Sequence, residues 1–473
     1  MTNKFYITTA IDYVNARPHV GHAFEKTITD VIARWNRLNG KDVFFLTGVD
    51  ENAQKNVQAA EKQGISVKEF VNKNTALFIE LCDKLNLSHD EFVRTSADKH
   101  AKVVQKIVKK IIDKGDIYKS EYEGLYCTGC ETYYTEKDLI DGKCPEHDKA
   151  PEKRKEEAYF FKLSKYEKKL LKIIPKYVTP KSKANEVLVR VKEGLTDICV
   201  SRKNVEWGIS FPNDEKFKIW VWIDALINYV SGLGEKEEKY WPAQVHVIGK
   251  GINWFHSVIW PAILLSANYS LPEKLLVHGY LNIEGKKMSK SIGNTIDPLE
   301  LLEKYSSDTV RYALLRNTIF EDSDFSEKIL KERHNNELAN KLGNLISRVS
   351  SLAEKYPLTK IENKLIKKLN LKKIEKHFEN YEIDKALQEV FSFVDKCNEY
   401  VQEKKPWETK DTKILYELAD SIKAIAILLY PFIPETSEKI AKQFNFEITY
   451  KNISQPLKIT KIKKGEILFK KIE

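Results

Sequence analysis

The chain has 473 residues, of which 42% are hydrophobic and 11% aromatic, so it is too long for one packed core and its length predicts two to four domains. Its formal net charge of +10 is compatible with a polyanionic partner but does not establish one. The sequence contains no signal-like basic and apolar leader and no apolar run of about 18 residues, so secreted and membrane-spanning classes are excluded and a cytoplasmic location is expected.

The first predicted elements are a strand, a helix and a second strand. Residues 4–10 are short, apolar and β-rich, as in a buried strand. A turn containing Pro18 precedes a helix whose apolar residues recur at helical spacing until Gly40 ends it. A second apolar strand follows at residues 43–48. This order is typical of the parallel sheets that bind nucleotides.

The later segments predict an interrupted sheet followed by helices. Gly, Cys and Tyr alternate with charges in residues 118–175, which suits small strands around a metal knuckle. We therefore predict an α/β fold, a Rossmann-type parallel-sheet domain with a zinc-knuckle insertion, followed by an all-α helix bundle. The predicted units are a first half of the sheet domain (1–117), the insertion (118–218, with the knuckle at 118–175), a second half of the sheet domain (219–280), a connecting region with a basic loop (281–325) and the bundle with a short tail (326–473).

The string His19-Val20-Gly21-His22 stands between the first predicted strand and its helix. Gly21 lets the backbone approach a phosphate closely, and a helix N-terminus offers free N–H groups and a positive dipole end. Two imidazoles at this spacing can donate hydrogen bonds to charge that develops on a reacting phosphate. Taken alone, the string fits two surface or core histidines about equally well.

The string Lys287-Met288-Ser289-Lys290-Ser291 is flanked by glycines. Two lysines separated by small residues can form a basic loop that neutralises the β- and γ-phosphates of a nucleotide. Such a string is usually a solvated surface loop. Its position after the histidine string, on a predicted nucleotide-binding sheet, makes chance a poor explanation for the pair.

Three of the six cysteines cluster, which is typical of a reducing compartment with one metal site and not of a disulfide framework. Cys127 and Cys130 are separated by two residues, and so are Cys144 and His147. Three thiolates and one imidazole in two knuckles fit a closed tetrahedral Zn²⁺ site. The motif thus predicts one structural zinc that holds the insertion. The alternative is a set of free cysteines beside a surface histidine.

At this point the chain resembles a known family. HVGH and KMSKS resemble the two signature motifs of class I aminoacyl-tRNA synthetases. Longer strings resemble the methionyl-tRNA synthetases within that class and are spread over nearly the whole chain: AIDYVNARPHVGH, VWIDALINYV, HVIGKGINWFHSVIWPAIL, HGYLNIEGKKMSKSIGNTIDPLELLEKY, NNELANKLGNLISR and KKPW. The resemblance implies a ligase that forms methionyl-adenylate from methionine and ATP with Mg²⁺, and transfers the methionyl group to the 3′ end of tRNA(Met).

The resemblance also implies which residues do this work. Catalysis by positioning and charge stabilisation would rest on His19, His22, Lys287 and Lys290. The implied ATP site adds Gly21, Gly249 and Ser289. The implied methionine site consists of Ile11, Tyr13, Asp50, Trp222, Ala225, Leu226, Tyr229, Ile252 and His256. In that site Asp50 would accept hydrogen bonds from the α-ammonium group, while aromatic and aliphatic side chains suit a thioether.

In the helix bundle, the resemblance implies contacts with the anticodon by Asn344, Arg348, Pro406 and Trp407. Trp407 would stack on an unpaired base, and Arg348 and Asn344 would read base edges. Longer family members carry a further C-terminal tRNA-binding domain that dimerises them, so this chain is expected to be a monomer.

Two departures from the family pattern concern the nucleotide site. Asn52-Ala53 stands where the family usually has His-Gly, and Gly251 stands where the family has a carboxylate that reaches the ATP ribose. One missing exposed hydrogen bond costs about 0.5–1.5 kcal/mol. Gly251→Asp is therefore expected to leave the KM for ATP unchanged or to improve it.

Three alternatives stay open on the sequence. Another class I synthetase would share both motifs, although those for leucine, isoleucine and valine normally carry a large editing insertion, for which 473 residues leave little room. A cysteine-specific member needs no such insertion. A catalytically silent homologue that only binds tRNA is kept open by Gly251. A small-molecule adenylyltransferase would leave the helical second half, with Arg348 and Trp407, without a role.

Overall fold

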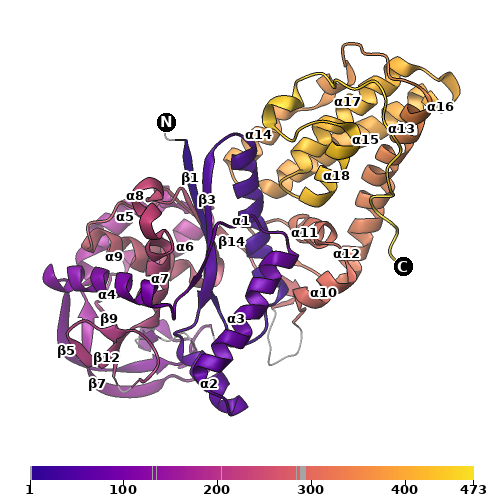
Figure 1. Cartoon of the computed structure of the whole chain (residues 1–473). Helices are drawn as coiled ribbons and strands as arrows, with labels where there is room; N and C mark the ends of the chain where they lie inside the picture. The colour runs from indigo at the N-terminus through magenta and orange to yellow at the C-terminus, as the bar shows by residue number, and fades with distance from the viewer. Residues whose placement is uncertain are drawn as a thin grey trace.

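The structure, a computed structural model, describes residues 3–129, 132–134, 136–146, 148–203, 205–283, 285–287 and 295–473. A layered α/β part and a helical part lie next to each other, with α10 (Pro298–Lys304), α11 (Ser307–Leu315) and α12 (Glu327–Arg333) between them (Figure 1). Among the described helices, none combines the length and the apolar character needed to cross a membrane.

The central sheet is parallel, with the strand order β2-β3-β1-β13-β14-β8 and β4 paired to β3. Its strands are β1 (Lys4–Thr9), β2 (Asp12–Tyr13), β3 (Asp42–Asp50), β4 (Glu91–Arg94), β8 (Val178–Thr179), β13 (Val245–Gly249) and β14 (Lys274–His278). Ile7 of β1 is opposite both Phe45 and Val245, because β1 pairs with β3 on one side and β13 on the other. The strand order thus reverses at β1, and such folds bind ligands at the carboxyl ends of the strands beside that point.

Both faces of this sheet are covered by helices, which explains why its strands are apolar almost throughout. Phe5 and Ile7 point into one core, and Tyr6 between them points into another. Helices α1 (Val20–Leu38) and α3 (Val67–Lys84) lie on the first face, whereas α4 (Asp98–Asp113), α7 (Val221–Ser231) and α9 (Trp260–Ser266) lie on the second (Figure 1). The remaining helices of this part are α2 (Gln54–Gln63), α5 (Glu167–Tyr177), α6 (Lys181–Lys192) and α8 (Glu237–Tyr240).

Helix α1 (Val20–Leu38) connects β1 to β3 and is buried along nearly its whole length. It contacts the sheet on one side and α11 and α15 (Ile383–Lys404) on the other. Gly40 follows it with a φ of +78°, the left-handed conformation that commonly ends a helix. Because α1 is covered on both sides, its charged residues must find their partners inside the protein.

The insertion after α4 differs from the small strands that the sequence predicts for residues 118–175. A long antiparallel hairpin joins β5 (Ile117–Cys127) to β7 (Glu152–Phe161), with β6 (Thr132–Tyr134) and β9 (Ile198–Cys199) beside it. Helix α5 follows, and β8 then pairs with β14 at the edge of the central sheet. The hairpin is largely polar and its residues pair through backbone hydrogen bonds, so apolar periodicity could not reveal its length.

Shorter strands complete the α/β part. β10 (Ser201–Lys203), β12 (Asp214–Ile219) and β11 (Ser210–Phe211) form a second antiparallel sheet that leads into α7. After β14, β15 (Leu281–Ile283) pairs with β16 (Lys286–Lys287) and β17 (Ser323–Asp324). This last sheet places residues 281–283 and 285–287 soon after the carboxyl end of a central strand.

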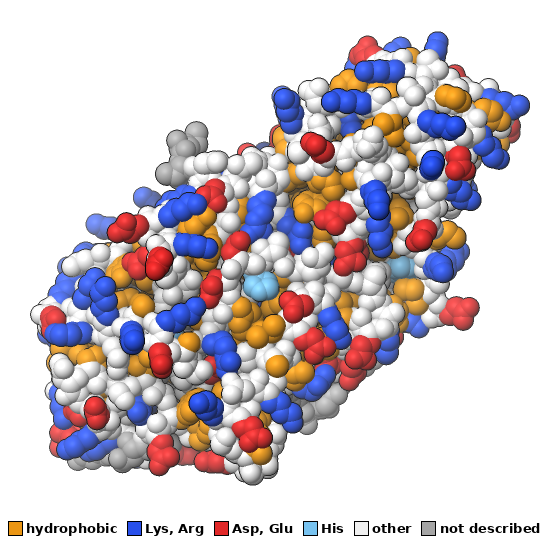
Figure 2. Space-filling view, viewed as in Figure 1, with side chains coloured by type: hydrophobic (Ala, Val, Ile, Leu, Met, Phe, Trp, Pro, Cys, Tyr) orange, Lys and Arg blue, Asp and Glu red, His pale blue; other side chains and the backbone are white. Residues whose placement is uncertain are grey.

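The helical part agrees with the all-α pattern predicted from residue 326 onward. After α12 come the π-helix η6 (His334–Gly343), α13 (Asn344–Lys355), α14 (Leu371–Glu379), α15 (Ile383–Lys404), α16 (Pro406–Thr409), α17 (Thr412–Leu429) and α18 (Pro434–Phe444). Residues 454–473 then run along the bundle back to η6, where the ring of His334 contacts the carbonyl of Lys470 at 2.8 Å. On the face shown in Figure 2, acidic and basic side chains are intermingled over the α/β part, and Lys and Arg are frequent over the helices.

Candidate active site

A cavity of about 440 Å³ lies at the carboxyl edge of the central sheet. Its walls come from residues within 10–25, 50–55, 222–229, 249–256 and 278–281. All nine residues predicted to contact methionine line it: Ile11, Tyr13, Asp50, Trp222, Ala225, Leu226, Tyr229, Ile252 and His256. So do His19, Gly21, His22 and Gly249 of the predicted ATP site. The structure thus brings the two predicted sets together in one cavity.

Two histidines form the N-terminal cap of α1. Nδ1 of His19, the N-cap residue, accepts a hydrogen bond from the Gly21 N–H at 3.1 Å, and Nδ1 of His22 accepts from the His19 N–H at 3.1 Å. Because each Nδ1 is an acceptor, each neutral ring carries its proton on Nε2. The rings are stacked with their centroids 3.7 Å apart. The cap therefore orients two N–H donors together at a positive helix end, which suits a phosphate.

A buried ion pair next to His22 escaped the sequence analysis. Nζ of Lys26, whose side chain is 1% exposed, is 2.8 Å from Oδ2 of Asp12. Burial favours a lower pKa for Lys26, but the charge and hydrogen bond of Asp12, together with nearby Cys82 and Glu25, outweigh it and the pKa is raised. The other oxygen of Asp12 is 3.8 Å from Nε2 of His22. Lys26 follows His22 by one helical turn, which is the only sequence signal for this pair.

The apolar end of the cavity contains a hydrogen-bonded tyrosine and histidine. Nε2 of His256 accepts from the Tyr229 hydroxyl at 2.7 Å, and Nδ1 of His256 donates to the Ile252 carbonyl at 3.0 Å. Burial lowers the pKa of His256 to about 4, so the ring is neutral at physiological pH. The ring of Trp222 stacks on that of Phe255, with the ring centroids 3.6 Å apart. This wall therefore presents aromatic and aliphatic surface without a net charge.

Asp50, at the end of β3, lines the same cavity, as do Asp12 and Glu25, and is 2% exposed. One of its oxygens accepts from the backbone N–H of Asn52 at 3.1 Å. The side chain of Asn52, the first residue that departs from the family pattern, donates to Asp224 at 2.8 Å, and Asp224 in turn contacts His100 at 2.6 Å. Asn52 thus ties the loop after β3 to helix α7.

Tyr280 occupies the space beside the second departure, Gly251. A Cβ atom added at Gly251 would lie 1.9 Å from the Tyr280 hydroxyl oxygen and 3.3 Å from the ring carbon that bears it. Lys250 lies 4.8 Å from the centre of the Tyr280 ring and pairs with Asp322 at 2.7 Å. The hydroxyl of Tyr280 therefore occupies the position that a side chain at 251 would need. Tyr280 lines the cavity and was not predicted from the sequence.

Glu25 and His278 are two further cavity residues that the sequence analysis missed. Glu25 accepts from the backbone N–H of Ala10 at 2.8 Å and lies 3.0 Å from Nε2 of His278. Glu25 belongs to α1 and His278 ends β14, so this contact joins the helix to the far side of the crevice. Neither residue carries a spacing signal, because the two are far apart in the sequence.

The predicted basic loop is described only in part. Lys287 belongs to β16 and its backbone pairs with Asn282 of β15, directly after the cavity residue Leu281. Ser289 and Lys290 lie outside the described residues. The hairpin β15–β16 therefore starts at the wall of the cavity and leads toward the loop.

The predicted metal ligands are also described in part. Cys127 ends β5 and is 4% exposed, and Cys144 is 1% exposed. The N–H of Asp148 donates to the Cys144 carbonyl at 2.9 Å, a hydrogen bond that closes a turn after Cys144. Cys130 and His147 lie outside the described residues. Within the described part of the chain, no group of three or more His, Cys, Asp or Glu side chains is arranged to hold a metal ion.

A second cavity lies on the helical part, far along the chain from the first. It is lined by Ser347, Arg348, Ser351, Leu352, Gln402 and Trp407. The structure thus brings together two of the predicted anticodon residues, and Trp407 is 41% exposed although it is a large aromatic side chain. Asn344 is exposed one turn before Arg348 on α13 but does not line this cavity, and Pro406 is buried at the start of α16.

Known protein families match both parts of the chain. The family described as "tRNA synthetases class I (M)" matches residues 5–150 and 138–350, and the one described as "Anticodon-binding domain of tRNA ligase" matches residues 362–470. Relatives named methionine–tRNA ligase include that of Clostridium acetobutylicum, 42% identical over 99% of this chain and 78% of the relative. The relative from Rickettsia conorii is 40% identical over 100% of both chains.

Solved structures match the whole chain as well. Mycobacterium tuberculosis methionyl-tRNA synthetase in complex with methionyl-adenylate has a TM-score of 0.94 and 34% identity, and the match covers 99% of this chain and 100% of that one. The apo form of the same synthetase has a TM-score of 0.87 and 31% identity, covering 100% of this chain and 99% of that one. The likeness therefore includes both the α/β part and the helical part.

Proposed function

The chain belongs to the class I methionyl-tRNA synthetases, and we infer that it works as a methionine–tRNA ligase. It activates methionine with ATP to methionyl-adenylate and transfers the methionyl group to the 3′ end of tRNA(Met). The observation that carries this function is the cavity at the switch point of the sheet, where an apolar wall, a buried carboxylate and a histidine-capped helix meet. ATP–pyrophosphate exchange with each protein amino acid tests it, and methionine should be the only efficient substrate.

We propose that the methionine is held at both ends before it reacts. Asp50 accepts hydrogen bonds from the α-ammonium group, because a buried carboxylate is the partner an ammonium needs. The side chain extends along Trp222 and Tyr229 toward His256. The hydroxyl of Tyr229 and both nitrogens of His256 already have partners within the protein, so this wall offers apolar surface to the thioether and repels charged side chains.

The chemical step requires no side-chain nucleophile. An oxygen of the methionine carboxylate forms a bond with the α-phosphorus of ATP, the bond from that phosphorus to the bridging oxygen breaks, and pyrophosphate leaves. We propose that the Nε2–H groups of His19 and His22 donate to the charge that grows on the α-phosphate, beside the backbone of Gly21. Lys287, Lys290 and Ser289 neutralise and hold the β- and γ-phosphates, which bring Mg²⁺ with them as their counter-ion.

The nucleotide end of the cavity changes one expectation. With the Tyr280 hydroxyl where a side chain at 251 would lie, we expect Gly251→Asp alone to raise the KM for ATP, since overpacking costs about 1–3 kcal/mol. Tyr280→Phe in the same chain removes the clashing oxygen and should restore most of the affinity. Steady-state kinetics of the two single variants and the double variant form a double-mutant cycle. An unchanged KM in Gly251→Asp alone would mean that Tyr280 moves away at no cost.

We also propose one structural Zn²⁺ held by Cys127, Cys130, Cys144 and His147. Support comes from the burial of Cys127 and Cys144 in a mostly polar insertion and from the turn that follows Cys144. A site with four protein ligands is closed, so the ion would contribute folding energy and no chemistry. A cytoplasmic location fits this proposal, because a reducing compartment keeps the thiols available.

Elemental analysis tests the zinc site. Cys144→Ser should lose the zinc and increase hydrogen exchange within residues 118–175, mainly before the buried Phe161 and Leu163, which belong to the main core and hold the later part in place. Cys199→Ser is the matched control, because Cys199 is buried on β9 of the same sheet but lies outside the motif. Purified protein without stoichiometric zinc, with its thiols oxidised in pairs, would contradict the proposal.

For the second cavity, we propose contacts with the anticodon. Trp407 offers an exposed ring for stacking on an unpaired base, and Arg348 in the cavity and the exposed Asn344 one turn before it offer donors to base edges. Pro406 fixes the start of α16 and so the position of the ring. The family match to an anticodon-binding domain covers Pro406 and Trp407 and supports this assignment.

A further inference from the structure

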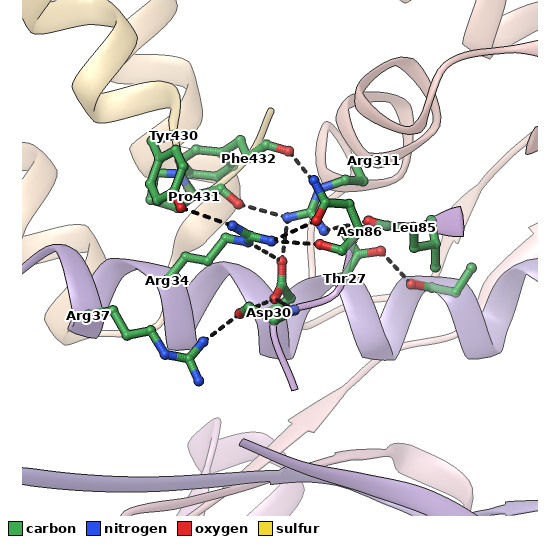
Figure 3. Close-up of polar contacts among 12 residues, drawn as sticks. Thr27, Asp30, Arg34, Arg37, Leu85, Asn86, Arg311, Tyr430, Pro431 and Phe432 are labelled. Atoms are coloured by element: carbon green, nitrogen blue, oxygen red, sulfur yellow. Dashed lines mark hydrogen bonds and ion pairs between the residues drawn. The ribbon is translucent and has the colours of Figure 1, made fainter. Parts of the chain in front are cut away.

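Two long helices connect the two proposed sites, and they meet at a buried cluster of charges (Figure 3). Helix α1, with 19 residues, starts at His19 and His22 in the active site. Helix α17, with 18 residues, starts directly after the α16 segment that carries Trp407. It ends at Leu429, and the next residues, 430–432, reach the middle of α1. We call Asp30, Arg34 and Arg311, which lie at this meeting point, the arginine joint.

Arg311 of α11 forms the centre of the joint and is 0% exposed. Its Nε donates to the Phe432 carbonyl at 3.0 Å and its Nη2 to the Pro431 carbonyl at 2.8 Å. Nη1 donates to the Leu85 carbonyl at 3.1 Å, and Nη2 lies 2.7 Å from a carboxylate oxygen of Asp30. One guanidinium thus holds the end of α17, the end of α3 and the middle of α1.

Arg34 adds a second connection one turn further along α1. Its Nε donates to Asp30 at 2.8 Å, its Nη1 to the Tyr430 hydroxyl at 3.2 Å and its Nη2 to the Asn86 carbonyl at 2.6 Å. The other oxygen of Asp30 accepts from the N–H and the hydroxyl of Ser88 at 2.7 and 2.6 Å. Both oxygens of the buried carboxylate are therefore satisfied, as a buried charge requires.

The geometry of the arginine joint is suited to holding the chain segments that meet there in fixed relative orientations. Burial favours a higher pKa for Asp30, but the charges of Arg311 and Arg34 and the bonds from Ser88 outweigh it and lower the pKa to about 2. The joint thus stays ionised at physiological pH. A guanidinium presents its donors in a fixed plane, so its bonds to three chain segments fix their directions as well as their distances. Further along α1, Trp35 stacks on Phe378 of α14 at 3.9 Å, which adds a second contact between the two parts.

We propose that Asp30, Arg34 and Arg311 are positioning residues for tRNA charging. They fix the bundle that contacts the anticodon to the helix that carries His19 and His22. When the anticodon of a tRNA fits the bundle, the 3′ end of that tRNA then lies next to the adenylate. This inference rests on the proposed function, and it assigns the link between base recognition and charging to a set of residues that contact neither tRNA nor methionine.

Kinetics with two transcripts test the proposal on the full chain. The probes are a methionine tRNA transcript and the same transcript with one anticodon base changed. Arg311→Lys keeps the charge but loses the planar fork, and we expect it to reduce the preference in kcat/KM for the matched transcript by about tenfold, within the usual range of coupling between sites. The loss should appear mainly in kcat, while ATP–pyrophosphate exchange and binding of an isolated anticodon stem–loop change little. A merely structural role would lower all these quantities together.

Two further variants keep the test decisive. Tyr430→Phe removes only the hydroxyl to which Arg34 donates, so it should fold even where Arg311→Lys does not, and it should reduce the preference by about threefold, the size of one hydrogen bond. Lys109→Gln is the control in the α/β part, because Lys109 of α4 pairs with Asp113 at 2.8 Å and, within the described part of the chain, neither residue forms a hydrogen bond or ion pair with the arginine joint. Wild-type preference in the folded joint variants, or an equal loss in Lys109→Gln, would overturn the inference. Absence of charging by the unaltered protein would instead overturn the proposed function.

Discussion

Replacement of His22 by Ala is expected to lower the rate of methionine-dependent ATP–pyrophosphate exchange by about 10²–10³-fold. The Nδ1 of His22 accepts from the His19 N–H, and this hydrogen bond orients the Nε2–H on the other side of the ring before the substrate arrives. A preorganised donor needs no rearrangement when charge develops on the α-phosphate, which is why its loss falls on the chemical step. Stopped-flow or exchange assays at saturating methionine and ATP measure this effect.

A second substitution at His22 separates the catalytic role from the capping role. His22→Asn keeps a short acceptor for the backbone N–H of His19 but cannot reach as far as the imidazole Nε2. We expect both variants to catalyse ATP–pyrophosphate exchange much more slowly than the unaltered protein. Only His22→Ala should also lower the free energy of unfolding, by about 1 kcal/mol, because the capping hydrogen bond is missing. Exchange at the unaltered rate in His22→Asn would contradict the proposed donor role.

Trp407→Ala is expected to lower kcat/KM for tRNA charging by the factor that corresponds to about 1–3 kcal/mol, the free energy of one base–aromatic stack. The rate of ATP–pyrophosphate exchange should be unchanged. Trp407 is 41% exposed and borders a cavity on the helical part, so its ring makes little contribution to the core. Parallel charging and exchange assays on one preparation provide the comparison.

Trp407→Phe serves as the control for this prediction. A phenyl ring keeps a flat surface for stacking, so this variant should retain most of the charging activity. If Trp407→Ala damages exchange as much as charging, the ring is part of the core instead and the proposed contact with the anticodon is wrong.

The strands and helices near the cavity could be predicted because their patterns are strong. β1, α1 and β3 were each indicated by apolar spacing, and the strand–helix–strand order predicts that their carboxyl ends meet at one edge. The residues expected around methionine came from family resemblance. Spacing alone gave Trp222 and Tyr229 no role beyond the core, and it is the fold that brings them to the same cavity as Asp50.

Other features depend on contacts that no local pattern encodes. Asp12 and Lys26 form a buried pair because α1 is covered on both faces, which the sequence of α1 alone does not reveal. The conflict between Gly251 and Tyr280 arises from two loops that follow different strands. The arginine joint likewise combines α1, α11 and the end of α17. From the sequence alone, each of its charged side chains would be predicted to lie at the solvated surface, because their partners belong to other helices.

The most direct measurement of the central claim is ATP–pyrophosphate exchange by the purified chain with each protein amino acid in turn. If the cavity is a methionine site, methionine supports rapid exchange, and leucine and isoleucine are far poorer substrates. Leucine and isoleucine have as many side-chain heavy atoms as methionine but are branched, and a misfit of about one methylene in an apolar pocket is worth about 1–3 kcal/mol. Exchange with leucine or isoleucine as fast as with methionine, or no exchange with any amino acid, would contradict the account.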